Sequence, residues 1–133
     1  MHTVFSSDLR HFVRTYDHGL DPALCQRMIE SFHALSRFHK VNGRTVRAGL
    51  EDSAWTELNV SRMSDAGFRA FFRQRIDRAL DEYNRDVGLT IPVPNSPVFA
   101  DLILKRYRPG QQEQFQLHFD AANHLAHRYL VLL

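Results

Sequence analysis

The sequence predicts an α+β fold in which helices pack on one face of an antiparallel sheet. In two segments of the first two thirds of the chain, apolar residues recur three or four positions apart, which is the spacing of an amphipathic helix. Prolines at positions 92, 94 and 97 then interrupt any helix. Alternating and β-favouring residues follow from position 100 onwards. We therefore expect a single domain, mainly helical over residues 1–98 and built of strands over residues 99–133.

The composition is that of a globular protein. The chain has 133 residues, of which 44% are hydrophobic and 24% charged, so it resembles neither a disordered nor a fibrous protein. Its longest apolar run, residues 129–133, is much shorter than the roughly 20 residues that span a bilayer, and we expect neither a membrane partner nor a signal peptide. Cys25 is the only cysteine, which excludes an internal disulfide and makes the cytoplasm the expected location.

The charge balance argues against a nucleic-acid partner. The 17 basic and 15 acidic residues leave a net charge of only +2, and the basic residues are spread along the chain rather than concentrated in one segment. Within residues 65–87, arginines stand three or four positions from acidic residues, as on a solvated helix surface.

The first predicted elements are a strand and a helix. Residues 12–16 alternate apolar and polar side chains, which predicts a short strand. Asp21 can cap a helix and Pro22 suits its first position, so we expect a helix that begins there and extends to about Phe38.

The segment that follows has a weaker pattern. Asn42 and Gly43 form a turn signal. Residues 44–63 show no clear period, and we expect them to be irregular apart from a short strand near residues 58–60. Trp55, the only tryptophan, is interpreted as a packing residue.

The best-defined helix covers residues 65–87. Ser64 or Asp65 can cap its beginning, and Gly88 stands where a left-handed residue would end it.

Strand patterns dominate the rest of the chain. Residues 100–107 favour a strand, Pro109 and Gly110 predict a turn, and residues 113–120 predict the returning strand. Residues 129–133 form a last apolar strand in this interpretation.

His118 and Asp120 are the residues that point to chemistry. Side chains two positions apart on a strand project to the same face, so this imidazole and carboxylate would lie side by side. They are two of the three ligands of a facial iron(II) site made of two histidines and one carboxylate. Phe115, three positions before His118, is expected on the opposite face of the strand, packed in the core.

The surrounding residues strengthen this interpretation. The motif content lies in Asp101-Leu-Ile-Leu-Lys-Arg-Tyr-Arg-Pro-Gly110, in Phe115-x-x-His118-x-Asp120 and in Arg128-x-Leu-x-Leu-Leu133, preceded by the compatible segments 12–16 and 20–25. Together they resemble the first half of the catalytic core in prolyl-4-hydroxylase-like Fe(II)/2-oxoglutarate dioxygenases.

The resemblance implies a fold and an activity. The helices would pack on the first strands of a double-stranded β-helix, or jelly roll, whose core is incomplete in this chain. His118 and Asp120 would bind Fe(II), Tyr107 would contact the cosubstrate 2-oxoglutarate, and ascorbate would be a further small-molecule requirement. The reaction would be the hydroxylation of a small-molecule or peptidyl substrate.

The sequence also departs from the family pattern. Only 13 residues follow Asp120, and no equivalent of the family's distal histidine or of its 2-oxoglutarate-binding Arg or Lys is found among them. We therefore expect the chain to be a fragment that is inactive alone. His124 or His127 could substitute as the third ligand, or both could belong to a solvated loop.

An interaction module without catalytic activity is the alternative function. The open edge of an incomplete sheet can pair with a partner chain or with a second copy, which would give a homodimer.

Overall fold

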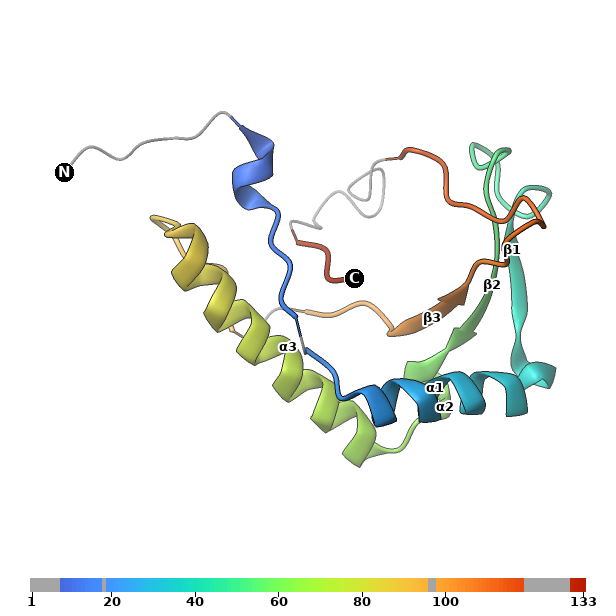
Figure 1. Ribbon diagram of the computed structural model, residues 1–133, viewed down its shortest axis with the longest axis horizontal. Coiled ribbons are helices and arrows are strands. Elements are labelled where there is room, and N and C mark those ends of the chain that lie inside the picture. Colours follow the sequence, from blue (N-terminus) through green and yellow to red (C-terminus); the bar gives the residue numbers. More distant parts are fainter. Residues whose placement is uncertain (1–7, 18, 96–97, 119–129) are drawn as a thin grey trace. The chain divides into compact units, whose positions relative to one another are not determined.

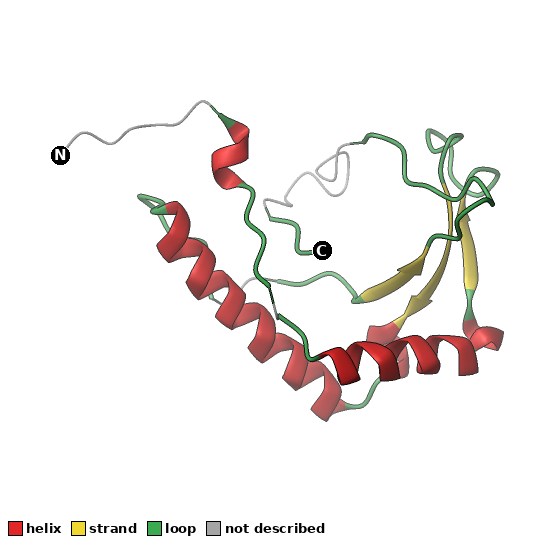
Figure 2. Cartoon of the chain, in the orientation of Figure 1, coloured by secondary structure: helices red, strands yellow, loops and turns green. Residues whose placement is uncertain are grey.

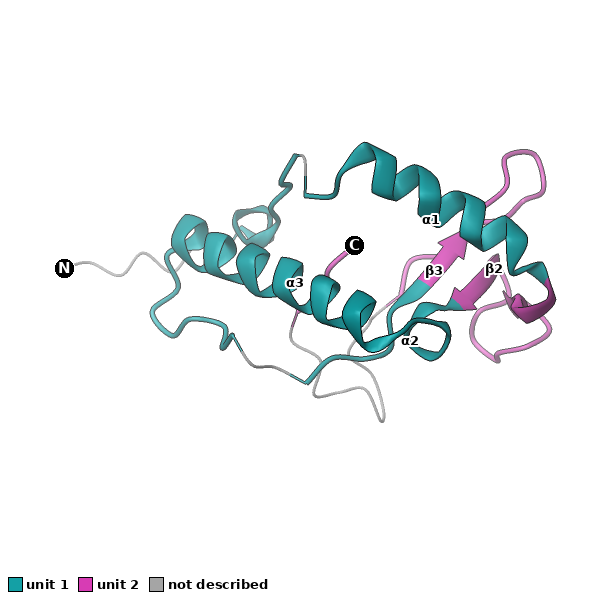
Figure 3. Cartoon of the chain, turned by 90° about the horizontal axis from the view of Figure 1, so that it is seen from below, with its two compact units in different colours: residues 1–36, 59–103 teal, residues 37–58, 104–133 magenta. Residues whose placement is uncertain are grey.

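The computed structural model describes residues 8–17, 19–95, 98–118 and 130–133 (Figure 1). Helices and strands are both present, as Figure 2 shows by colour, and the strands form a small antiparallel sheet. The predicted α+β class is therefore confirmed. The chain divides into two compact units, residues 1–36 with 59–103 and residues 37–58 with 104–133 (Figure 3).

The helix α1, Pro22–Ala34, begins where the sequence predicts. The Asp21 carboxylate accepts a hydrogen bond from the backbone N–H of Leu24 at 3.1 Å, and Pro22 occupies the first turn, where no donor is lost. The helix ends earlier than expected, because a short 3₁₀ turn, η2 (Ser36–Phe38), replaces its predicted last turn.

The helix α3, Ala66–Val87, confirms both predicted ends. Asp65 caps it by accepting from Phe68 N–H at 2.8 Å, and Gly88 ends it with φ of 65°. Leu80 and Val87 are its buried residues.

The segment before α1 does not form the strand predicted for residues 12–16. It contains the 3₁₀ turn η1, Leu9–Phe12, followed by irregular chain. The hydroxyl of Tyr83 donates a hydrogen bond to the carbonyl of Phe12 at 2.9 Å, and the His11 ring lies 3.3 Å from the Val87 carbonyl. Contacts with α3 therefore replace strand pairing as the means of holding this segment.

The sheet consists of β1 (Lys40–Gly43), β2 (Ala54–Asn59) and β3 (Ile103–Arg106), in the order β1-β2-β3. Lys40 pairs with Glu57 and Gly43 with Ala54 in the antiparallel register of β1 and β2. The short strand predicted near residues 58–60 overlaps the end of β2, but the prediction that the rest of residues 44–63 is irregular was wrong, because β2 begins at Ala54 and a short helix, α2 (Val60–Met63), follows it. Asn42 and Gly43 end β1, and the turn follows them.

The strands are not confined to the last third of the chain. β1 and β2 both precede α3, and the predicted strand over residues 100–107 is shorter than expected. The turn at Pro109 and Gly110 is confirmed. Beyond it, the described residues of the segment 113–120 form one isolated bridge, between Gln114 and Ala54, rather than a continuous strand. Residues 130–133 also lack strand structure.

The buried residues of the second unit gather on β2 and its flanks. Trp55 is 2% exposed, which confirms its role as a packing residue, and Leu58, Thr56, Ser53 and Asn42 are buried with it. Among the described residues, no helix has the length and apolar character needed to cross a membrane.

Candidate functional site

Two of the three predicted site residues are described by the structure, and both belong to the second unit (Figure 3). Tyr107 directly follows β3, and His118 follows the bridge at Gln114. Asp120 lies outside the described residues, as do His124 and His127.

The segment before His118 is anchored although it is not a strand. The backbone of Ala54 donates to the Gln114 carbonyl at 2.8 Å, and the Gln116 N–H donates to the Ser53 hydroxyl at 3.0 Å. The amide oxygen of Gln116 accepts in turn from the backbone of Asp52 at 2.9 Å. Side-chain and backbone hydrogen bonds thus fix residues 114–116 against residues 52–54.

The ring orientation of His118 is set by its own backbone neighbourhood. Its Nδ1 lies 2.7 Å from the Gln116 carbonyl oxygen, and a carbonyl only accepts hydrogen bonds, so Nδ1 carries a proton. In the neutral ring, this tautomer places the lone pair on Nε2. Metal-ligating histidines in proteins commonly have this arrangement, in which the non-coordinating nitrogen donates to a carbonyl or carboxylate.

The second constraint on His118 is aromatic. Its ring stacks on Phe115, with centroids 3.9 Å apart and planes inclined by 20°. Phe115 is half-buried and contacts Trp55 on β2 at a centroid distance of 4.7 Å. The expectation that Phe115 and His118 lie on opposite faces was wrong, because the segment lacks the regular alternation of a strand.

Lys105 on β3 belongs to the same cluster. Its ammonium lies 4.5 Å from the Phe115 centroid and 5.0 Å from the Trp55 ring, both within cation–π range. We call Trp55, Lys105, Phe115 and His118 the aromatic–lysine cluster. Sequence reasoning assigned no site role to Lys105; its position two residues before Tyr107 was the available signal.

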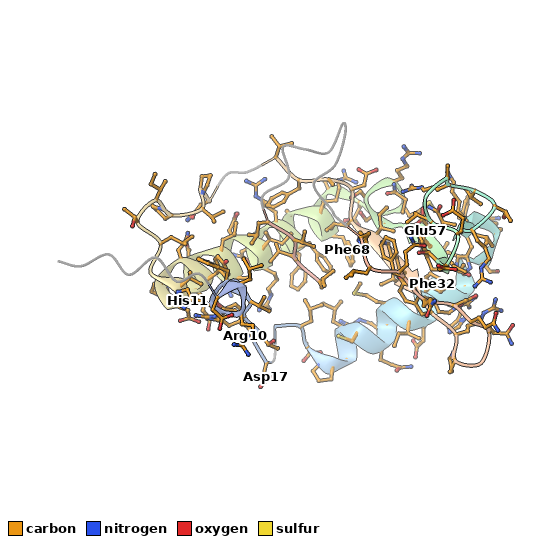
Figure 4. The ribbon with its side chains drawn as sticks, turned by 90° about the horizontal axis from the view of Figure 1, so that it is seen from above. Arg10, His11, Asp17, Phe32, Glu57 and Phe68 are labelled. Atoms are coloured by element: carbon orange, nitrogen blue, oxygen red, sulfur yellow. The ribbon has the colours of Figure 1, made fainter. Side chains whose placement is uncertain are left out.

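Glu57, which is labelled in Figure 4, contacts the cluster through a hydrogen bond with Trp55. Its carboxylate accepts from the Trp55 indole N–H at 2.6 Å and from the Asn42 side-chain amide at 3.2 Å. Partial burial raises the pKa of Tyr107, and the negative charge of Glu57 raises it further. Tyr107 is therefore a neutral phenol at physiological pH, able to donate a hydrogen bond to an anionic ligand.

The turn between β3 and the His118 segment is closed by an ion pair. Glu113 accepts from the backbone N–H of Arg108 at 2.7 Å, and its other oxygen accepts from Nη2 of the same arginine at 2.6 Å. These hydrogen bonds hold the pKa of Glu113 below its usual range and raise that of Arg108. The pair ties the two ends of the turn together, and so links the strand before Tyr107 to the segment that leads to His118.

The described residues contain no group of three or more His, Cys, Asp or Glu side chains that could hold a metal ion. Of the predicted iron ligands, His118 is the one that lies within the described residues.

Comparison of the chain with protein-family models, with curated proteins and with solved structures gives no match.

Proposed function

We propose that the chain is part of an Fe(II)/2-oxoglutarate-dependent dioxygenase of the hydroxylase type. In this proposal the three-stranded sheet supplies the first strands of a double-stranded β-helix. His118 and Asp120 are two ligands of the metal, and Tyr107 binds the cosubstrate. The family resemblance of residues 101–133 is the origin of the proposal.

The observation that carries the proposal is the state of the His118 ring. Iron(II) accepts imidazole ligands through a nitrogen lone pair, and the hydrogen bond from Nδ1 to the Gln116 carbonyl leaves Nε2 as the ligating atom of the neutral ring. The stack on Phe115 restrains the ring further. The donor chemistry of this residue therefore fits the metal.

Each residue then has a defined task. Nε2 of His118 and a carboxylate oxygen of Asp120 would bind the iron. The phenol of Tyr107 would donate a hydrogen bond to an oxygen of the cosubstrate. Phe115 covers one face of the imidazole. With Fe(II) bound, dioxygen would be the oxidant and 2-oxoglutarate would supply two electrons: one oxygen atom would enter the succinate that forms as carbon dioxide leaves, and the other would enter a C–H bond of the substrate.

Anaerobic titration of the full chain with Fe(II) and 2-oxoglutarate tests the proposal. A 2-oxo acid that chelates iron(II) produces a visible absorption band, and we expect the native chain to give this band only at high Fe(II) concentration, because two protein ligands hold the metal weakly. His118→Ala and Asp120→Ala should each abolish it. His33→Ala, which removes an exposed histidine of α1, should retain it.

Two results would overturn the proposal. One is a native chain that gives no band at saturating Fe(II) and 2-oxoglutarate. The other is a band that persists unchanged in both ligand variants. Far-UV circular dichroism of each variant confirms that loss of the band is not loss of the fold.

The alternative is an interaction module that completes its sheet with another chain. β1 and β3 are the edge strands of the described sheet, and Val41 on β1 is 72% exposed. Analytical ultracentrifugation distinguishes the two ideas: the alternative requires a concentration-dependent dimer that Val41→Lys dissociates, whereas the dioxygenase proposal is compatible with a monomer.

A further inference from the structure

Asn42 and Gly43 form the one Asn-Gly pair in the sequence, and this pair has no part in the proposed function. In such a pair the glycine nitrogen can attack the side-chain carbonyl carbon of the asparagine, because glycine carries no side chain that hinders the approach. Asparagine is for this reason a chemically labile residue. The way in which the fold holds the two residues therefore decides how fast the reaction proceeds.

The folded chain holds the two reacting groups in an unreactive arrangement. The Gly43 N–H donates to the side-chain oxygen of Asn42 at 2.9 Å, so the nitrogen keeps its proton and directs it at the oxygen. Asn42 is 6% exposed and is paired with Trp55 across β1 and β2, which limits the access of water and hydroxide. Since the attack requires removal of that proton, β1 must first separate from β2.

The environment of the Asn42 side chain favours an amide over an acid. Its Nδ2 donates to one carboxylate oxygen of Glu57 at 3.2 Å, and the Trp55 indole donates to the other at 2.6 Å. An aspartate at position 42 has no N–H to donate, and its ionised form would place a second negative charge beside Glu57.

The backbone at Gly43 has no room for a longer main chain. A Cβ added to Gly43 would overlap the Ser53 carbonyl group and lie 2.9 Å from Ala54 Cα. Gly43 is paired with Ala54 at this point, and an isoaspartyl residue at position 42 would insert a further methylene into the main chain beside it. Neither acid product therefore fits the paired form of β1.

We propose that Asn42 is a site of spontaneous deamidation that the pairing of β1 with β2 protects, and that its products cannot restore this pairing. The deprotonated Gly43 nitrogen bonds to the side-chain carbonyl carbon of Asn42, the bond from that carbon to Nδ2 breaks, and Nδ2 leaves as ammonia after taking up a proton. Water then opens the resulting succinimide at one of its two carbonyl groups, which gives aspartate or isoaspartate without any oxidant. Reaction during one opening of β1 thus makes the opening irreversible.

Peptide mapping by mass spectrometry tests the protection. The full chain is incubated at mildly alkaline pH in buffer and, unfolded, in urea. We expect conversion of Asn42 to be at least about tenfold slower in buffer, because it requires β1 to open. Asn59, which precedes the β-branched Val60, is the internal control and should convert slowly in both conditions. Equal rates for Asn42 in buffer and urea, or no conversion in urea, would overturn the proposal.

Val41→Gly tests whether the opening of β1 controls the rate. Val41 is 72% exposed, so the substitution removes little packing but lowers the preference for a strand. Conversion of Asn42 should become several-fold faster in buffer and stay unchanged in urea. An unchanged rate in buffer would show that the opening of β1 is not the protected step.

Asn42→Asp tests whether the aspartate product fits. We expect its thermal midpoint to lie about 3 °C or more below that of the native chain. Glu57→Gln in the same chain should reduce this penalty, measured against Glu57→Gln alone, because it removes the facing charge. Recovery of folding by the double variant gives the same result if Asn42→Asp does not fold. An Asn42→Asp chain as stable as the native one, or a penalty that Glu57→Gln leaves unchanged, would contradict the exclusion of the product by Glu57.

Discussion

The imidazole of His118 stacks on the phenyl ring of Phe115, with 3.9 Å between the ring centroids. Phe115 is in turn packed on Trp55, so the orientation of the predicted iron ligand depends on a residue that is anchored in the core of the sheet. Packing against β2 therefore orients a side chain that belongs to no regular element.

We expect Phe115→Leu to make the orientation of the His118 ring less fixed without removing His118 as a metal ligand. The substitution keeps an apolar side chain but removes both ring contacts, which should cost about 1 kcal/mol of unfolding free energy. Mn(II) binding should weaken by roughly tenfold, as when a group that orients a metal-ligating histidine is removed. Urea denaturation and Mn(II) titration measure the two effects.

The control for this change is Phe38→Leu. Phe38 is 41% exposed in the same unit, and its ring contacts Arg37. Mn(II) affinity should be unaffected by it. Equal weakening by both substitutions would show that the stack on Phe115 has no special part in orienting His118.

Gly43→Ala should be among the most destabilising single substitutions in the second unit. Gly43 has φ of 98°, and an added Cβ would overlap the Ser53 carbonyl group and approach Ala54 Cα to 2.9 Å, both of which are backbone. We expect a loss of about 3 kcal/mol or more, enough to weaken the pairing of β1 with β2. Thermal unfolding measures the loss.

Gly49→Ala separates steric overlap from backbone strain. Gly49 has a similar φ of 82°, but an added Cβ would meet nothing within 4 Å. It should cost only about 1 kcal/mol, the penalty of a left-handed residue. If Gly43→Ala and Gly49→Ala lower the unfolding free energy equally, the backbone of Ser53 and Ala54 can move to accommodate the added Cβ at position 43.

Local signals explain which elements the sequence predicts. The ends of α3 are specified by Asp65 and Gly88, and the start of α1 by Asp21 and Pro22, so each boundary depends on residues within a few positions of it. The turn at residues 109–110 is local in the same way. These predictions are confirmed because each of them depends on residues near the boundary or turn and not on contacts between distant parts of the chain.

The elements that the sequence does not predict depend on contacts between residues that are far apart in the sequence. β1 has four residues and β2 six, and neither has a strict alternation; they are strands because Lys40 meets Glu57 and Gly43 meets Ala54. The candidate site follows the same rule. Lys105 joins it through rings that are distant in sequence, contacts that no spacing rule reveals.

The N-cap of α3 offers a local test. Asp65→Ala removes the acceptor for the Phe68 N–H and should lower the unfolding free energy by about 1 kcal/mol. Asp65→Asn retains an acceptor and should lie within a few tenths of a kcal/mol of the native chain. Chemical denaturation distinguishes the two, and equal stability of the alanine and asparagine variants would contradict the capping role.

The Arg108–Glu113 pair predicts a pH dependence of stability with a definite sign. Hydrogen bonding to Arg108 lowers the pKa of Glu113 in the folded chain relative to the unfolded chain. The unfolded state therefore binds more protons between the two pKa values, so the stabilisation is complete above the unfolded pKa and is lost as the pH falls through the folded pKa. Glu113→Gln should remove this contribution, and its urea midpoint should fall less steeply than that of the native chain on acidification.

Arg108→Gln is the complementary variant, because it removes the guanidinium partner of Glu113 and leaves the Glu113 carboxyl group in place. Both single variants should show the same shallower acid dependence, and the double variant should show no further change, since the effect belongs to the pair. The native chain and the variants should converge at a pH below the folded pKa, where Glu113 is protonated. An acid dependence that persists unchanged in Glu113→Gln would assign it to other carboxyl groups, and the turn before His118 would then be held by its backbone and not by this ion pair.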